Sequence, residues 1–463
     1  MKKFIGCIAA LALCVPLLAQ EVSPTQPAPA APQEKQKKEN VPIDKYRRSS
    51  LYSVLVKHSA FKFGNTIDST FMSMPTPDKF NNHDLAIKSF ESTAVKQKKK
   101  GKEKTDINMK DIQTFLTEND IAKKMVEKWF DRNPQTGAFD MELIKERGQY
   151  DASQADIDIA DQSALGRGIL EDAGEDLINK TFLLINDITF VDKGEKSAKV
   201  GGFFRMLGSV ASSVTGTDVT SMTDLAADLV NEIDGFSVNI TSYLYQLDWT
   251  NDVAGTFYTS YWVNQNQPDP ARCNGFDTCT LFKLNYVGTT ATSAANLSSK
   301  SFSNKSKEEQ MLKVCTRAID KSIVQLQREY DEFKVNVPLY SINEDGTVDV
   351  QIGLKEGINE KSQFDVLMPT EDEMGKMTYV KVGKIEPVEN RIWDNRYGAL
   401  EDAEALATDP DAAKKANKAK DKAKDDDGHG DVTLTATTFR VLSGANKIVP
   451  GCLVREVTIK RDK

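Results

Sequence analysis

The sequence predicts a mixed α+β protein with an N-terminal helical extension, a central α/β domain and a C-terminal small all-β barrel or sandwich. Three observations support this class. Apolar residues recur at helical spacing over much of residues 45–150. A helical pattern then leads into the continuous apolar and β-branched run TFLLINDITFVD, which is typical of a strand buried on both faces. After residue 332 the apolar period switches to two, as in strands with one face on a core.

The first 44 residues predict an exported chain. Two lysines precede the apolar run Phe4–Ala19, which is short for a membrane span and typical of a signal peptide over residues 1–19 that is cleaved after Ala19. Residues 20–44 are rich in Pro, Ala and Lys and predict a disordered leader. We therefore expect the protein in the periplasm, or associated with the outer membrane, of a Gram-negative bacterium. A lipid anchor at Cys14 is the weaker alternative.

Composition narrows the classes of partner. The net charge of −8 over 463 residues is mild and argues against nucleic acid as a main partner. The hydrophobic content of 40% is enough to form real cores. After the signal, no apolar run reaches the roughly 18 residues of a membrane-spanning helix.

Residues 45–150 predict a helical subdomain with a basic loop. Leu51, Val54, Leu55 and His58 recur at helical spacing, and the same spacing returns further along the region. Between these patterns, the segment VKQKKKGKEK holds six lysines and predicts a solvated loop. A contact with anionic lipid headgroups or with an acidic partner is the alternative.

Residues 151–332 predict the α/β domain, with a helix over Ser153–Asn179 before the buried strand. The Gly-rich apolar insertion VGGFFRMLGSVASSVTG follows that strand. Three runs rich in aromatic residues and Thr predict further strands: FSVNITSYLYQLDW, GTFYTSYWV and TLFKLNYVGTTATSA. Lys307–Glu332 carries a single apolar stripe and predicts a long amphipathic helix.

Residues 333–463 predict a small β-barrel interrupted by a charged insertion at about 401–431. The runs FKVNVPLYSI and VDVQIGL flank NEDGT, whose Asp-Gly pair signals a hairpin turn. Four more strand patterns occur in SQFDVLMP, MTYVKVGKIEPVENRIW, VTLTATTFRVLS and LVREVTIKR. Six short strands in one region are typical of a small barrel or sandwich. The insertion is rich in Ala, Lys and Asp and predicts partial helix or disorder.

These patterns resemble known envelope proteins. The order of helix, buried strand, aromatic strands and long amphipathic helix resembles the periplasmic α/β domain of the curli secretion-channel lipoprotein family and of penicillin-binding-protein activators. The segments VQIGLKEGINEKSQFDVLMP and VKVGKIEPVE resemble the small C-terminal barrel of flagellar T-ring proteins. In such a barrel Gly357 would allow positive φ at a tight turn. The core would be filled by Phe364, Val366, Val382 and Ile385. The chain departs from the channel-forming family in lacking its lipobox.

One loop resembles a calcium site. In WFDRNPQTGAFDMELI the residues Asp131, Asn133, Gln135 and Glu142 take the first, third, fifth and twelfth positions of an EF-hand loop. Thr136 occupies the sixth position, where such a loop needs glycine, so an ion-free helix connection is the favoured interpretation. Apart from this weak candidate the sequence predicts no metal site.

Two cysteines are disulfide candidates. Cys273 and Cys279 flank a short loop in ARCNGFDTC, and an oxidising compartment would allow them to pair. The alternative is two free thiols. Cys315 and Cys452 fall within apolar patterns and are expected in cores.

No catalytic residue and no cofactor-binding residue can be assigned, and no cofactor is expected. The phosphate-binding, nucleophile-elbow, zinc-protease and dinucleotide motifs do not occur. The 68 acidic residues nevertheless leave a carboxylate pair open. Asp248, beside Trp249, is the first candidate for a carbohydrate-binding surface, against the alternative of a buried strand end.

Five aromatic or apolar side chains are candidates for partner contacts: Phe203, Phe204, Leu207, Trp249 and Trp262. The first three share a helical face of the Gly-rich segment, which fits either an interfacial helix or an ordinary helix over the sheet.

The favoured function is therefore a non-enzymatic envelope scaffold or assembly factor. Its expected partners are envelope proteins, peptidoglycan or the membrane surface, with a homo-oligomer also open. The alternative is a carbohydrate-binding protein or hydrolase that acts on envelope glycans through carboxylates. An adhesin braced by calcium is a weaker third hypothesis.

Overall fold

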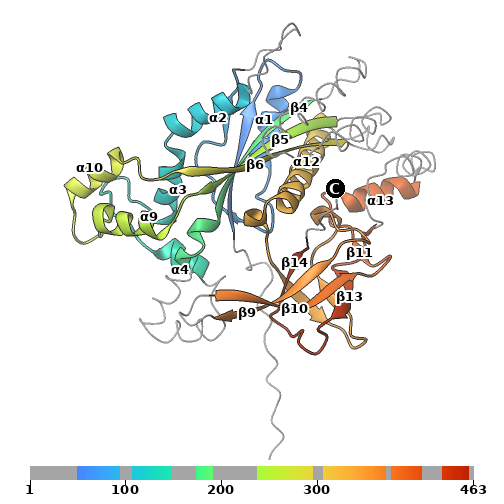
Figure 1. The fold of residues 1–463 in the computed structure, drawn as a ribbon. Coiled ribbons are helices and arrows are strands. Elements are labelled where there is room, and N and C mark those ends of the chain that lie inside the picture. Colours follow the sequence, from blue (N-terminus) through green and yellow to red (C-terminus); the bar gives the residue numbers. More distant parts are fainter. Residues whose placement is uncertain are drawn as a thin grey trace, which may run out of the picture. The chain divides into compact units, whose positions relative to one another are not determined.

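The protein is a mixed α+β structure, described by a computed structural model over residues 49–93, 107–148, 174–190, 237–295, 306–371, 377–408 and 430–457 (Figure 1). Within these ranges the chain forms one mixed sheet flanked by helices, and a closed β-barrel. None of the helices in the described ranges has the length and apolar character that a membrane crossing requires.

The sheet has the order β2-β1-β4-β5-β6, with β3 also paired to β1. The strands are β1 (Ser50–Lys57), β2 (Asn81–Asn82), β3 (Ser89–Glu91), β4 (Thr181–Phe190), β5 (Ser237–Leu247) and β6 (Leu284–Ala295). β1 runs parallel to β2, β3 and β4, whereas β4, β5 and β6 are successively antiparallel. The strands predicted in TFLLINDITFVD, FSVNITSYLYQLDW and TLFKLNYVGTTATSA are confirmed.

The predicted helix through Leu51, Val54, Leu55 and His58 is wrong, because this segment is the strand β1. Its side chains alternate between two cores: Tyr52, Val54 and Val56 face one, whereas Leu51 and Leu55 face the other. A strand covered on both faces is apolar throughout, so a helical spacing can be read from it by coincidence. Residues 45–150 therefore do not form a purely helical unit, since their first strand pairs with β4.

One face of the sheet is covered by α1 (Gly64–Ser73) and α12 (Lys307–Glu329). The predicted helix Lys307–Glu332 is confirmed, although α12 ends at Glu329 and a short turn, η4 (Asp331–Phe333), follows. A capping box starts α12: the amide of Glu309 donates to Ser306 Oγ at 3.1 Å, and the amide of Ser306 donates to Glu309 Oε2 at 2.9 Å. The buried stripe of α12 comprises Met311, Val314, Cys315, Ala318, Ile319, Ile323 and Leu326.

The opposite face is covered by shorter helices (Figure 1). These are α2 (Ile107–Glu118), α3 (Ile121–Trp129), α4 (Glu142–Gly148), α9 (Asn251–Thr256) and α10 (Pro270–Thr278), with the turn η2 (Ile178–Lys180). The strand predicted in GTFYTSYWV is wrong. Thr250 caps a helix there by accepting from the amide of Val253, and a wider helical turn (Phe257–Tyr261) continues it. Most of the helix predicted over Ser153–Asn179, and the Gly-rich insertion, lie outside the described residues.

The C-terminal region is a closed six-stranded barrel of order β10-β13-β8-β7-β14-β9. Its strands are β7 (Val337–Ile342), β8 (Val348–Val350), β9 (Phe364–Glu371), β10 (Met377–Pro387), β13 (Thr437–Ser443) and β14 (Leu453–Glu456). The six strand predictions are thus confirmed, and closure removes the free edges that a sandwich would keep. Phe364, Val366 and Ile385 are buried inside, and Val382 packs against them.

Smaller elements surround the barrel. They are η5 (Leu354–Glu356), α13 (Ala399–Thr408) and the pair β11 (Ile392–Trp393) and β12 (Gly430–Asp431). α13 begins the predicted insertion, and residues 409–429 lie outside the described ranges. Gly357, which follows η5, has φ +70°, as the sequence predicts.

We expect Gly357→Ala to destabilise the fold by about 1–2 kcal/mol in urea unfolding, because a side chain at positive φ is strained. The added Cβ would also lie 2.7 Å from Val324 Cγ1 on α12. Gly255→Ala is the control, since nothing lies within 4 Å of its Cβ in α9 and the change should be neutral or stabilising by up to about 1 kcal/mol. Equal stability of Gly357→Ala and the unmodified protein would contradict this account of the turn.

Candidate functional site

The candidate site is a cavity of about 250 Å³ that brings together segments distant in the sequence. One wall is formed by Ser53 of β1 and by the end of α1 with the loop after it. Another comes from α12, and the barrel region contributes Lys355 of η5 together with the segment after β11. The apolar lining consists of Phe71, Met74, Pro75, Pro77 and Ile319, and the polar lining includes Thr76, Thr316, Asn395 and Tyr397.

Three carboxylates and two ammonium groups line this cavity. Lys355 Nζ lies 2.8 Å from Asp78 Oδ2, and Lys88 Nζ lies 2.8 Å from Asp84 Oδ2. The amide of Ser53 also donates to Asp84 Oδ1 at 3.3 Å. Two of the three acids are therefore held in ion pairs at the cavity wall.

Asp320 is the third acid, and its environment differs. It accepts no hydrogen bond from a side chain and forms no ion pair within the described residues. Its pKa is raised to about 7, mainly by burial and then by the charges of Glu356 and Asp78. The charges of Lys355 and Arg317 oppose this rise. This carboxyl group therefore exchanges its proton near neutral pH, which is what a general acid or base requires.

The pKa of Lys355 is raised by the neighbouring carboxylates. Although its own burial lowers the pKa, the carboxylates of Asp320 and Asp78 raise it overall. Glu356, next to it, is used locally: its Oε2 accepts from the amide of Gly353 and from Asn395 Nδ2, both at 2.7 Å. The backbone that carries Lys355 is held further by Asn395 Oδ1, which accepts from the Lys355 amide at 2.8 Å.

The polar side of α12 contacts the barrel region and so shapes the cavity. Arg328 donates to the carbonyl of Gly357 at 2.6 Å and lies 3.0 Å from Glu456 Oε1 of β14. Nearer the start of α12, Lys313 and Arg317 both bind Asp402 of α13, at 2.7 and 2.6 Å.

Contacts with main-chain carbonyls strengthen this junction. Lys313 Nζ donates to the carbonyl of Gly398 at 2.9 Å, and Arg317 Nε donates to that of Tyr397 at 2.9 Å. From the loop after α1, Lys79 Nζ donates to the carbonyl of Gln351 at 2.9 Å. Bonds from charged groups to carbonyls on both sides of the cavity fix its walls.

The described histidines make structural contacts. Nη1 of Arg147, on α4, donates to Ser50 Oγ at 2.8 Å and lies 3.1 Å from His83 Nδ1. The guanidinium carbon of Arg147 lies 4.4 Å from the centre of the Trp129 ring. Burial and then the charge of Arg147 hold the pKa of His83 well below its usual value. His58 Nε2 lies 2.6 Å from Asp187 Oδ1, which joins the ends of β1 and β4.

Two residues of the calcium candidate make local contacts within the loop and α4. Asn133 Oδ1 accepts from the amides of Gln135 and Thr136, and Glu142 pairs with Lys145 at 3.0 Å. The loop thus uses its own oxygens for an Asx turn and a helical ion pair. Within the described ranges, no group of three or more His, Cys, Asp or Glu side chains is placed to hold a metal ion.

Of the two alternatives for Cys273 and Cys279, the structure has the free thiols and not the disulfide. Cys273 lies in the helix α10, and Cys279 follows its last residue; Asp269 begins this helix, and its carboxylate accepts from the amides of Ala271 and Arg272. The five residue steps from Cys273 to the end of the helix rise by about 7.5 Å, which already exceeds the Cα separation of a disulfide. Cys273 Sγ instead lies 3.4 Å from the carbonyl of Thr136.

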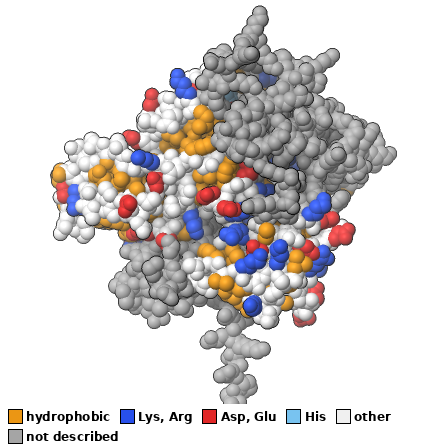
Figure 2. Space-filling model, in the orientation of Figure 1, with side chains coloured by type: hydrophobic (Ala, Val, Ile, Leu, Met, Phe, Trp, Pro, Cys, Tyr) orange, Lys and Arg blue, Asp and Glu red, His pale blue; other side chains and the backbone are white. Residues whose placement is uncertain are grey.

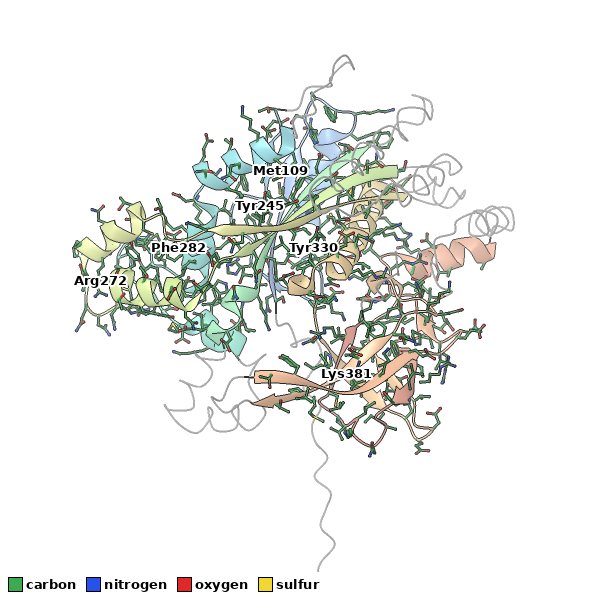
Figure 3. All side chains as sticks on the ribbon, in the orientation of Figure 1. Met109, Tyr245, Arg272, Phe282, Tyr330 and Lys381 are labelled. Carbon is green, nitrogen blue, oxygen red and sulfur yellow. The ribbon has the colours of Figure 1, made fainter. Side chains whose placement is uncertain are left out.

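Of the five residues predicted to contact a partner, two lie in a core and three fall outside the described residues. Trp249 is 7% exposed and Trp262 is partly buried, and both pack in an aromatic cluster with Phe130 and Phe257. They therefore belong to a core, and the Asp248–Trp249 pair does not form an open sugar-binding platform. Figure 3 shows Phe282 of this cluster, whose ring stacks on Trp249 at 6.4 Å, and Arg272, which donates to the carbonyl of Trp262. Phe203, Phe204 and Leu207 lie outside the described residues.

Sequence reasoning missed the cavity acids because they come from three distant segments. One feature of the sequence could have indicated Asp320. It directly follows Ile319 of the apolar stripe of α12, so the helical pattern places it at the border of a buried face. No comparable pattern marks Asp78 or Lys355.

No protein-family model matches the chain, and no curated protein matches it.

We expect Asp320→Asn to stabilise the protein at pH 8 and to leave its stability unchanged near pH 4. The folded carboxyl keeps its proton up to about pH 7, whereas the unfolded one loses it near 3.8, so this group lowers stability as pH rises between these values. Removing its charge should gain between about 1 and 4 kcal/mol at pH 8 in urea unfolding. The exposed Glu332→Gln is the charge-matched control. A less stable Asp320→Asn protein at pH 8 would refute the assignment.

Proposed function

We propose that the chain is an exported protein of the bacterial envelope that acts as a scaffold or assembly factor through protein-protein contacts. The supporting observation is where apolar surface is exposed. Among the described residues, seven of the nine large apolar side chains that are well exposed fall in the barrel region: Tyr340, Ile342, Val380, Tyr397, Leu400, Leu442 and Val449. The other two are Met72 and Tyr286.

On the barrel strands, the exposed apolar side chains point away from the barrel core. On β7, Val337 and Leu339 are buried, whereas Tyr340 and Ile342 are exposed. On β13, Phe439 is buried and Leu442 is exposed. Figure 2 shows apolar side chains at the surface of this region, interspersed with Lys and Arg. Concentration of exposed apolar groups in one region is typical of a surface that contacts another protein.

Photo-crosslinking in native envelopes tests this proposal. A photoreactive residue at Leu442 or Tyr340 should give one discrete adduct, because both side chains would lie in the interface. The same residue at Met72 or Tyr286 should give none. Ile342→Ser should reduce the Leu442 adduct at least about tenfold, since on this proposal it removes an apolar contact of the interface, which costs more than about 1.4 kcal/mol.

Adducts of equal yield at all four positions, or none at Leu442 and Tyr340, would contradict a contact surface on the barrel. The mass of the adduct separates a second copy of the chain from another envelope protein.

A second candidate function is the binding or hydrolysis of envelope glycans. It is favoured by the cavity that holds Asp78, Asp84 and Asp320, of which Asp320 titrates near neutral pH. One ionised and one protonated carboxyl is the arrangement that glycosidases use. Release of reducing ends from peptidoglycan fragments, lost in Asp320→Asn and retained in Glu332→Gln, would support hydrolysis. Equal release by both variants would exclude this cavity as its site.

A further inference from the structure

The cavity beside α12 has an unbalanced charge. Its wall carries three carboxylates and two ammonium groups, and the ammonium groups of Lys355 and Lys88 are each held by one of the acids at 2.8 Å. Arg317, which also acts on Asp320, is itself bound to Asp402 at 2.6 Å. Among the described residues, Asp320 is thus the cavity carboxylate that forms no direct ion pair, although the charge of Lys355 acts on it, and it can accept a cation from outside.

The rest of the cavity lining indicates which chemical group would carry that cation. Phe71 and Ile319 are buried, and with Met74, Pro75 and Pro77 they form an apolar lining next to Asp320. Tyr397, 43% exposed, also lines the cavity. Aromatic and aliphatic walls around a single acid fit a cation on a short hydrocarbon chain, since the chain gains burial and the charge gains a partner.

From this geometry we infer that the cavity binds an organic ammonium group on a short aliphatic chain, with its charge against the carboxylate of Asp320. The chemistry is the same for a free amine and for the lysine side chain of a peptide. This inference does not rest on the contact surface of the barrel or on glycan hydrolysis, and it can hold if either fails.

Binding should depend on the ionisation of Asp320. The charged groups that act on it are Lys355 and Glu356 from η5, Asp78 from the loop after α1, and Arg317 on α12 itself. Because the cation pairs with the ionised carboxylate, affinity should rise with pH through about 7 and level off above it.

Calorimetric titration of the full chain at pH 8 with pentylamine tests the inference, with pentanoate and pentanol as probes of equal length. Pentylamine should bind at least about tenfold more tightly than either, which corresponds to one ion pair at a partly buried site. Asp320→Asn should lose this preference, and Glu332→Gln should keep it. Lys355→Met should bind pentylamine more tightly, because it removes a competing ammonium group; it keeps the test valid if Asp320→Asn fails to fold.

A second arm separates the two sources. The tripeptide Ala-Lys-Ala binding more tightly than pentylamine would identify a protein side chain as the occupant, and the reverse order would identify a free amine. Three outcomes overturn the inference: no binding of pentylamine at millimolar concentration, equal binding of pentylamine and pentanoate, or equal binding by the unmodified protein and Asp320→Asn.

Discussion

The structure depends on α12 having both of its faces occupied. Its apolar stripe, from Met311 to Leu326, packs on the sheet, and its polar side holds the barrel region through Lys313, Arg317 and Arg328. Burial of the stripe supplies the larger share of the free energy, because it removes a row of aliphatic side chains from water. The charged contacts then fix register, since each ends on a particular carbonyl or carboxylate. One helix therefore positions two β-structures, which neither of its faces could do alone.

The cavity and its acid follow from this double role. Residues at the border between the two faces of α12 are neither in the sheet core nor free in water, and Asp320 lies at that border. The loop after α1 and η5 close over it, bringing Asp78 and Lys355 to the same space. A buried carboxylate that forms no direct ion pair costs stability, and a bound cation would offset that cost. A buried carboxyl group that donates a proton in catalysis would carry the same cost in stability.

The sequence predicted elements with one clear period and failed where a segment serves two cores. α12 and the six barrel strands have a single buried face, so their periods of 3.6 and 2 were readable. β1 has two buried faces, and its apolar spacing wrongly predicts a helix. The segment after Thr250 is rich in aromatic residues, as strands often are, but it forms helical turns whose aromatic side chains pack in the core. The cavity acids could not be predicted because ion pairs such as Asp78–Lys355 join residues far apart in the chain, which a single sequence does not reveal.

The scaffold proposal and the cation site place function at two locations of the same molecule: the outer surface of the barrel and the space beneath it. α12 contacts elements next to both locations. Asp320, at the border between its two faces, is therefore the residue at which the account can be tested most directly. That test is a titration of the Asp320 carboxyl carbon by NMR in the full chain, assigned with Asp320→Asn. The account predicts a midpoint near 7, which shifts downward when pentylamine is added. A midpoint near 4 that pentylamine does not move would contradict it.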